Sequence, residues 1–187
     1  MAIIIVVDTE TTGLDPVSAA IVELGAVVMV EDHEVDQFTS LCNPGEEYLG
    51  LDADGALEVN NITRDQIRTA PAIEKVAEEF RKWLEPWIEA GALLTAFNVP
   101  FDRGFLVVEP WKIPSEWWST IDIMLKAMDT MREGRALKRR MNGSEKWPSL
   151  KEAAKFFRVI PEGDPHRALT DVRTEATILS LINSQKP

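Results

Sequence analysis

The sequence lacks the features by which secreted and membrane proteins are usually recognised. It has a single cysteine, Cys42, so no disulfide bond can form within the chain, and a reducing compartment is expected. No apolar stretch approaches the roughly 20 residues of a membrane-spanning helix. The apolar run at 2–7 is short and leads straight into Asp8, which indicates a buried strand and not a signal peptide. We therefore expect a cytoplasmic protein with no membrane partner.

Basic residues are also scarce in this chain. Its 20 Lys and Arg stand against 31 Asp and Glu, which gives a net charge of −11 over 187 residues. Such a protein is not expected to coat nucleic acid by bulk charge. A nucleic-acid enzyme stays compatible with this charge, because metal ions can supply positive charge at a site. The content of 45% hydrophobic and 27% charged residues argues against a disordered or fibrous chain, and the length suits one domain over residues 1–187.

The hydrophobic pattern predicts strands first, and then helices mixed with strands. Apolar runs indicate a meander of three strands and a later fourth, at 3–7, 21–30, 37–42 and 92–97. Gly, Pro and acidic residues indicate a loop at 43–62. Apolar spacings of three and four predict a helix after Pro71, which Pro86 should kink or end. Further helices are expected at 101–108, 121–131, 150–157 and from 168 onward, so the order favours an α/β layered domain with a mixed sheet.

Two carboxylates, Asp8 and Glu10, stand where the first strand ends. Residues two apart on a strand point to the same face, so these carboxylates should lie side by side. They would repel each other and raise each other's pKa unless a cation lay between them. Hard oxygen ligands suit Mg²⁺ or Mn²⁺, although a polar strand end followed by a glycine turn is the alternative.

Two later motifs add acidic groups and a histidine. Asp102 closes the segment NVPFD after the fourth strand, where an aspartate is also commonly a helix cap. His166 lies in a turn-rich loop, and Asp171 lies one turn into the last helix. A lone histidine is more often structural or exposed than catalytic, so neither motif identifies a function alone.

The three motifs together resemble those of the DEDDh exonucleases, the family that includes the proofreading epsilon subunit of bacterial DNA polymerase III. That family has Asp-x-Glu-Thr-Thr-Gly, Asn-x-x-Phe-Asp and His-x-Ala-x-x-Asp, and this sequence has DTETTG, NVPFD and HRALTD in the same order. The resemblance spans essentially the whole chain. It implies a ribonuclease H-like three-layer fold with a central mixed five-stranded sheet flanked by helices. It also implies metal-dependent 3′→5′ hydrolysis of nucleic acid.

The resemblance further implies a role for each catalytic residue. Asp8, Glu10, Asp102 and Asp171 would hold two divalent metal ions, Mg²⁺ or Mn²⁺. His166 would be the general base that deprotonates the attacking water. An imidazole that titrates near neutral pH suits this role, and a loop position would let it move onto the water once substrate binds.

The same resemblance implies a pocket for the terminal nucleotide. Its walls would be formed by Thr11, Leu14, Ile62, Asn98 and Phe101. Leu14 and Ile62 could sandwich the terminal base, a contact that tolerates any sequence. Core packing is the alternative for Leu14, Ile62 and Phe101. Phe97 stands where many relatives have histidine, which makes the pocket more apolar.

One stretch runs against the acidic character of the chain. Residues 132–146 contain six basic and two acidic side chains, a net charge of +4. Within this stretch, Arg139 and Arg140 are candidate contacts for the phosphates of a bound strand, and an ordinary solvated segment is the alternative. The tryptophans of the loop at 110–118 could stack bases or cover the core.

The expected function is a 3′→5′ exonuclease that releases nucleoside 5′-monophosphates from single-stranded DNA or 3′ overhangs. An exoribonuclease of the same family and a non-catalytic nucleic-acid-binding module are the alternatives, and the complete set of acids and His166 favours an enzyme. A phosphatase with an aspartyl nucleophile would need Asp-x-Asp, and here Glu10 occupies the third position. The sequence ends soon after the last helix, which favours a stand-alone enzyme. A polymerase or another replication or repair partner remains compatible with it.

Overall fold

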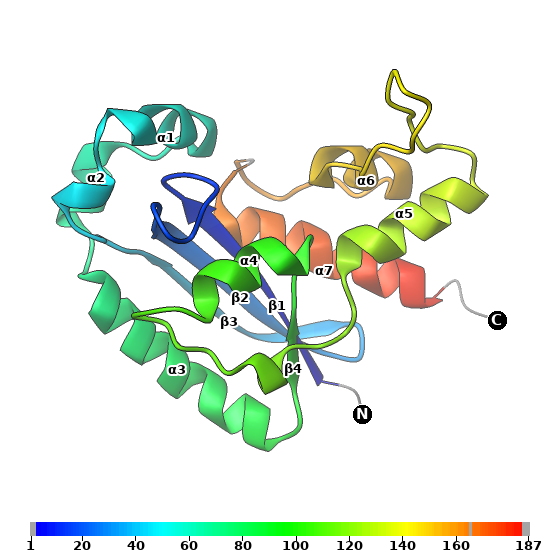
Figure 1. Cartoon of the computed structure of the whole chain (residues 1–187). Coiled ribbons are helices and arrows are strands. Elements are labelled where there is room, and N and C mark those ends of the chain that lie inside the picture. Colours follow the sequence, from blue (N-terminus) through cyan, green and yellow to red (C-terminus); the bar gives the residue numbers. More distant parts are fainter. Residues whose placement is uncertain (1–2, 165, 185–187) are drawn as a thin grey trace.

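A computed structural model describes residues 3–164 and 166–184, and they form a mixed sheet covered by helices on both faces (Figure 1). Strands β1 (Ile3–Thr11), β2 (Ile21–Val30) and β3 (His33–Leu41) form the predicted antiparallel meander. Strand β4 (Leu93–Thr95) pairs parallel with β1, which gives the order β3-β2-β1-β4. The predicted mixed sheet is therefore confirmed.

The prediction of a fifth strand is wrong for the described residues, where the sheet has four. An extended segment does run beside β4, but it forms only one bridge, between Leu94 and Trp118. The Ser119 N–H donates to the Leu94 carbonyl at 2.8 Å. Asp122 follows almost at once as the cap of the next helix, its carboxylate accepting the Leu125 N–H at 3.0 Å, so the segment has no room to become a strand.

The alternation of side chains along β1 divides the interior into two cores. Ile5 and Val7 face the first core, beneath helices α3 (Ile73–Glu89) and α4 (Val99–Leu106), and Val6 faces the second. The second core lies beneath helices α5 (Ile123–Glu133), α6 (Leu150–Phe157) and α7 (Ala168–Ser184). Asp8 and Glu10 share the parity of Val6, so they face the α7 side of the sheet.

The segment 43–62 is not the irregular loop that its composition predicts. It contains two short 3₁₀ turns, Glu46–Tyr48 and Leu51–Ala53, and helix α1 (Asp54–Asn60), with α2 (Arg64–Thr69) directly after it. Apolar residues at intervals of about four give it a small core of its own, formed by Val22, Leu49, Ala53, Leu57, Ile62 and Ile67. The many glycines and acids on its outer side hide this pattern in the sequence.

Two other expectations concern Pro86 and the tryptophans of the loop at 110–118. Helix α3 runs through Pro86 and ends three residues later at Glu89, so its end lies close to the proline as expected. Trp111 and Trp118 are buried and Trp117 packs against the first core, so these tryptophans cover the core. Among the described residues, no helix is long and apolar enough to cross a bilayer.

Candidate active site

Three elements bring the acidic residues of the motifs to one end of the sheet. Strand β1 carries Asp8 and Glu10, α4 carries Asp102 in its first turn, and α7 carries Asp171. Ligand atoms of Glu10, His166 and Asp171 all lie within 4.8 Å of one another. The structure therefore unites residues that are more than 150 positions apart in the sequence.

Asp102 is held in place by a residue from the middle of the first motif. Its Oδ1 accepts hydrogen bonds from the Thr9 N–H at 3.0 Å and from the Thr9 hydroxyl at 2.8 Å. Thr9 points to the opposite face of β1 from Asp8 and Glu10, which is the face that α4 covers. The threonine of the motif thus fixes α4 to the strand that carries the other acids.

The carboxylates destabilise one another in the metal-free protein. Burial raises the pKa of Glu10 to about 7, with Asp171 and Glu23 adding to the shift. Burial also raises the pKa of Asp102 to about 7, although the Thr9 hydrogen bonds oppose it. The pKa of Asp8 lies well above its usual range because of burial and the neighbouring Glu175 and Asp102.

This arrangement fits divalent cations. The Oδ2 atom of Asp8 is buried and has no hydrogen-bond partner among the described residues. Several carboxylates crowd around it, and a cation would remove both the repulsion and the unsatisfied oxygen. A donor set made of carboxylate oxygens suits Mg²⁺ or Mn²⁺ and not softer metals.

A fifth acid, Glu175, belongs to the cluster and was missed by the sequence reasoning. It is 1% exposed, and its Oε2 accepts the Phe97 N–H at 3.1 Å. Burial, together with Asp102 and Asp171, raises its pKa well above the usual range. Its position four residues after Asp171 places it on the same face of α7, and this spacing was the available signal.

His166 is exposed beside the cluster in the loop before α7. Its backbone has a left-handed φ of 59°, an uncommon conformation for a residue with a side chain. The next residues are anchored to β2: Arg167 forms a two-pronged ion pair with Glu23, and Glu23 also accepts the Ala168 N–H at 3.1 Å. The loop is therefore fixed immediately after His166, while the imidazole itself stays accessible.

The residues expected to surround the terminal nucleotide differ in accessibility. Leu14 is 85% exposed, and Asn98 and Phe101 are half-buried at the start of α4. Thr11 is buried, with its hydroxyl donating to the Gly13 carbonyl at 2.6 Å, and its carbonyl accepts the Asn60 side-chain N–H at 3.1 Å. Ile62 is 3% exposed within the small core under α1, which favours the alternative of core packing for this residue.

Arg139 and Arg140 lie away from the carboxylates along the chain, in the connection between α5 and α6. Both side chains are exposed. The Arg139 guanidinium donates to the Gly143 carbonyl at 3.2 Å. Their role as phosphate contacts stays a prediction.

Fold and site together define a nuclease: buried carboxylates and a histidine meet at one end of a mixed sheet. The family model described as Exonuclease matches residues 5–179, and the chain belongs to that family, the DEDDh-type 3′→5′ exonucleases. The enzyme class and the family expected from the motifs are therefore confirmed.

Curated relatives share about half of the chain. The chain is 34% identical over 102 residues to the PolC-type DNA polymerase III of Staphylococcus haemolyticus, a match that covers 54% of this chain and 6% of that protein. It is 40% identical over 105 residues to a DNA polymerase III subunit epsilon-like protein of Rhodobacter capsulatus, a match that covers 54% of this chain and 14% of that protein. The chain thus spans only a small part of the length of these relatives.

Solved structures share the fold over nearly the whole chain. Escherichia coli exonuclease I in complex with a dA16 oligonucleotide superposes with a TM-score of 0.77 at 17% identity, covering 100% of this chain and 42% of that one. Exonuclease X in complex with 5′ overhanging duplex DNA gives a TM-score of 0.65 at 22% identity, and the match covers 97% of this chain and 92% of that one. These matches confirm the ribonuclease H-like fold.

Proposed function

We propose that this chain, as a single domain over residues 1–187, removes nucleotides from the 3′ end of nucleic acid and releases nucleoside 5′-monophosphates. The observation that carries the proposal is the meeting of the motif carboxylates with His166 at the end of β1. A non-catalytic binding module would have no need for a cluster of buried acids whose mutual repulsion destabilises the fold.

In this proposal, Asp8, Glu10, Asp102 and Asp171 hold two divalent ions, Mg²⁺ or Mn²⁺. When bound, such ions stabilise the negative charge that develops on the reacting phosphate and make a bound water more acidic. His166 accepts the proton of the attacking water at a ring nitrogen. Its exposed position beside Glu10 and Asp171 suits a base that must meet the substrate's phosphate.

The terminal nucleotide binds between the end of β1 and the start of α4. Leu14 has the exposed apolar surface needed to pack on a base, and the half-buried Asn98 and Phe101 form the facing wall. Thr11 contributes as a hydrogen-bond acceptor through its hydroxyl oxygen, because the hydroxyl proton goes to the Gly13 carbonyl and the Thr11 carbonyl already accepts the Asn60 side chain. For Ile62 we propose a supporting role beneath α1 and no direct contact with the base.

Single-stranded DNA and 3′ overhangs are the proposed substrates. A structural relative of this chain has been solved in complex with a dA16 oligonucleotide, and sequence relatives include DNA polymerase III proteins. A replication or repair partner, such as a polymerase, belongs to the same proposal. A location in the cytoplasm rests on the single, buried Cys42.

A digestion series tests the proposal. A 5′-labelled single strand should give a descending ladder with Mg²⁺ or Mn²⁺, while a 3′-labelled strand should lose its label at once as mononucleotide. Parallel RNA and duplex substrates identify the preferred nucleic acid. Internal cleavage as the first event, or activity that persists in EDTA, would contradict the proposal.

A further inference from the structure

Two segments of opposite charge flank the end of β1. The acidic lobe, residues 43–62, contains five acids and no Lys or Arg. The basic lobe, residues 132–158, contains nine basic and three acidic side chains, a net charge of +6 in a chain of −11. Figure 1 shows α1 of the acidic lobe and α6 of the basic lobe on opposite sides of the loop that follows β1. A polyanion at the site therefore meets attraction on one side and repulsion on the other.

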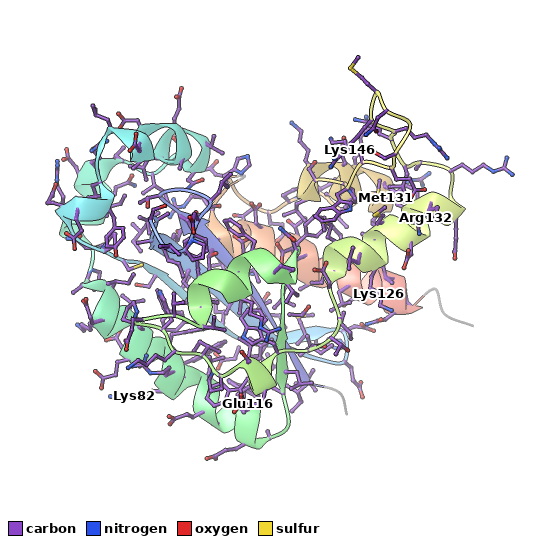
Figure 2. All side chains as sticks on the ribbon, viewed as in Figure 1. Lys82, Glu116, Lys126, Met131, Arg132 and Lys146 are labelled. Atoms are coloured by element: carbon purple, nitrogen blue, oxygen red, sulfur yellow. The ribbon has the colours of Figure 1, made fainter. Side chains whose placement is uncertain are left out.

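The outer part of the basic lobe is a hairpin that projects from the molecule (Figure 1). The Lys146 N–H donates to the Lys138 carbonyl at 2.9 Å, and the Arg140 N–H donates to the Ser144 carbonyl at 2.8 Å. The backbones of Arg139 and Glu145 pair as an isolated antiparallel β-bridge. Figure 2 shows Lys146 at this end of the molecule, far from Lys82 on α3. These backbone contacts give the hairpin, residues 138–146, a defined shape.

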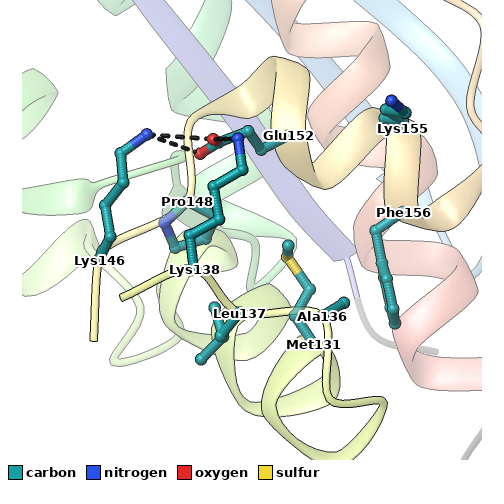
Figure 3. Close-up of a pocket in the computed structure, with 9 residues that line it drawn as sticks. All are labelled: Met131, Ala136, Leu137, Lys138, Lys146, Pro148, Glu152, Lys155 and Phe156. Atoms are coloured by element: carbon teal, nitrogen blue, oxygen red, sulfur yellow. Dashed lines mark hydrogen bonds and ion pairs between the residues drawn. The ribbon is translucent and has the colours of Figure 1, made fainter. Parts of the chain in front are cut away.

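Some cations of the basic lobe are already neutralised. Lys138 and Lys146 both contact the Glu152 carboxylate, at 2.7 and 3.1 Å (Figure 3). Arg132 is paired with Asp129 and Glu145. Six other cations form no ion pair within residues 3–164 and 166–184; they are Arg135, Arg139, Arg140, Lys151, Lys155 and Arg158.

The unpaired lysines connect the catalytic cluster with the hairpin. A hollow of about 480 Å³ is lined by His166 and Asp171 on one side and by Lys151 and Lys155 of α6 on the other. Lys155 also lines a second hollow of about 340 Å³, together with Lys138 and Lys146 at the base of the hairpin. The two hollows therefore follow each other along α6, away from the catalytic histidine.

Apolar side chains are unusually exposed along the same lobe. Met141, near the hairpin tip, is fully exposed, and Trp147, directly after the hairpin, is 56% exposed. An exposed aromatic ring among unpaired cations is typical of surfaces that bind single strands, because bases stack on the ring while phosphates meet the cations.

We propose that the strand upstream of the scissile bond runs along the basic lobe, from the hollow at Lys151 and Lys155 to the hairpin. Arg139 and Arg140 then contact its phosphates, Trp147 stacks on its bases, and the acidic lobe keeps the strand from taking the opposite direction. This inference rests on the proposed function and adds to it the surface that holds long substrates.

Two double variants test this path, Lys151→Ala with Lys155→Ala and Arg139→Ala with Arg140→Ala. For a single-stranded 20-mer, each should raise KM by about tenfold and leave kcat nearly unchanged. In binding titrations with a labelled 20-mer in EDTA, the salt slope should fall by about 0.7 for each phosphate that the variant no longer neutralises. A dinucleotide cannot reach the hairpin, so the Arg139→Ala with Arg140→Ala variant should cleave it with a kcat/KM within about twofold of wild type.

Matched variants separate local contacts from net charge and from folding. Lys75→Ala with Lys82→Ala removes two exposed cations from α3 and should change neither KM nor the salt slope. Arg139→Lys with Arg140→Lys should retain binding of the 20-mer. On the acidic lobe, Asp52→Asn with Glu58→Gln should strengthen binding of the 20-mer.

The outcomes distinguish this inference from the proposed function. Equal losses on the dinucleotide and the 20-mer in the Arg139→Ala with Arg140→Ala variant, or an unchanged KM and salt slope in both basic-lobe variants, would overturn the path. Unchanged or weaker binding after neutralising the acidic lobe would overturn the role given to that lobe. If the wild type cleaves neither substrate, the proposed function fails, while the binding titrations still decide the path.

Discussion

Asp8 is the residue at which the repulsion within the site is most concentrated. One of its carboxylate oxygens is buried without a partner among the described residues, and Glu175, Asp102 and Glu10 all raise its pKa. A neutral side chain of similar size would relieve this repulsion, so the repulsion has no structural benefit. The crowding of carboxylates around Asp8 is explained if this oxygen binds a cation in the active protein.

We expect Asp8 and His166 to differ in what their loss removes. Asp8→Ala should lower the affinity for Mn²⁺ and reduce exonuclease activity below detection, because a ligand charge is lost. His166→Ala should leave Mn²⁺ affinity close to wild type while turnover falls by roughly 10²–10⁴-fold, the usual contribution of a positioned base. Calorimetric titration with Mn²⁺ and single-turnover kinetics measure the two effects.

Asp171→Ala is the matched control for Asp8→Ala and His166→Ala. It removes a proposed metal ligand from the first turn of α7, which directly follows the loop of His166. It should behave like Asp8→Ala in both measurements. Loss of Mn²⁺ binding in His166→Ala would instead make His166 a metal ligand, an outcome that its distance from Glu10 and Asp171 permits.

Among the elements, the contact between β2 and the start of α7 determines where Asp171 lies. Gly25 pairs with Asp8 across the sheet, and a Cβ atom at this position would lie 2.5 Å from the carbonyl carbon of Ala168. Only a residue without a side chain lets the helix approach the strand this closely. The first turn of α7 can therefore bring its acids to those of β1.

Gly25→Ala should push α7 away from the sheet and lower the free energy of unfolding by about 1–3 kcal/mol. Activity should fall further than this loss of stability explains, because Asp171 moves with the helix. Gly55→Ala, on α1, meets no atom within 4 Å and serves as the control, with stability expected to stay equal or rise. Chemical denaturation and kinetics well below the melting temperature check both, and a Gly25→Ala protein with full activity would contradict the packing argument.

Glu23 on β2 fixes the other side of the same junction. It accepts the Ala168 N–H and pairs with Arg167, which is the residue directly after His166. Glu23→Ala should lower the free energy of unfolding by about 1–3 kcal/mol, a range reduced for the partial exposure of Arg167. It should also lower kcat more than Mn²⁺ affinity, since the loop of His166 loses its anchor.

Glu23→Gln provides the comparison, because its side-chain oxygen can still accept the Ala168 N–H. We expect kcat and stability between those of wild type and Glu23→Ala. Thermal melts, steady-state kinetics and Mn²⁺ titration of the three proteins give the order. Equal kcat in all three would show that the ion pair does not position His166.

At the scale of the whole molecule, the acid cluster should make the stability of the metal-free protein depend on pH. The pKa values of Glu10 and Asp102 are raised to about 7 in the folded protein, so the folded state binds more protons than the unfolded state. Stability from these groups is full below their unfolded pKa values, near 4, and is lost as pH rises through about 7. In EDTA, the melting temperature should therefore fall between about pH 4.5 and pH 8.

Added Mn²⁺ should reverse this loss, and it should raise the melting temperature more at about pH 8 than at about pH 5, where protons compete for the carboxylates. Glu10→Gln should flatten part of the pH slope in EDTA, which separates the site from the general charge of −11. Calorimetric melts in EDTA and in Mn²⁺ provide the measurement. A melting temperature that rises with pH across this window in EDTA would contradict the raised pKa values.

The sequence alone located strands β1 to β3 and helix α6, although β1 continues past the predicted end at Val7 to Thr11 and β3 begins at His33 and not at Gln37. Helix α6 begins and ends where the pattern predicts, because Ser149 and Glu152 form a local capping box and the apolar spacing is regular. Strands β1 and β2 follow from apolar runs that the sheet buries, whereas β3 is the exposed edge of the meander. These features depend on interactions between residues close in the chain, which periodicity and capping record directly.

Tertiary structure alone decided which residues meet and which are hidden. Helix α1 forms because Leu57 and Ile62 pack beneath it, and the fifth strand is absent because Asp122 starts α5 too early. Glu175 joins the site only when α7 lies against β1, and Glu152 neutralises Lys138 and Lys146 only when the hairpin lies beside α6. Burial and charge pairing arise between segments far apart in the chain, so no local pattern in the sequence records them.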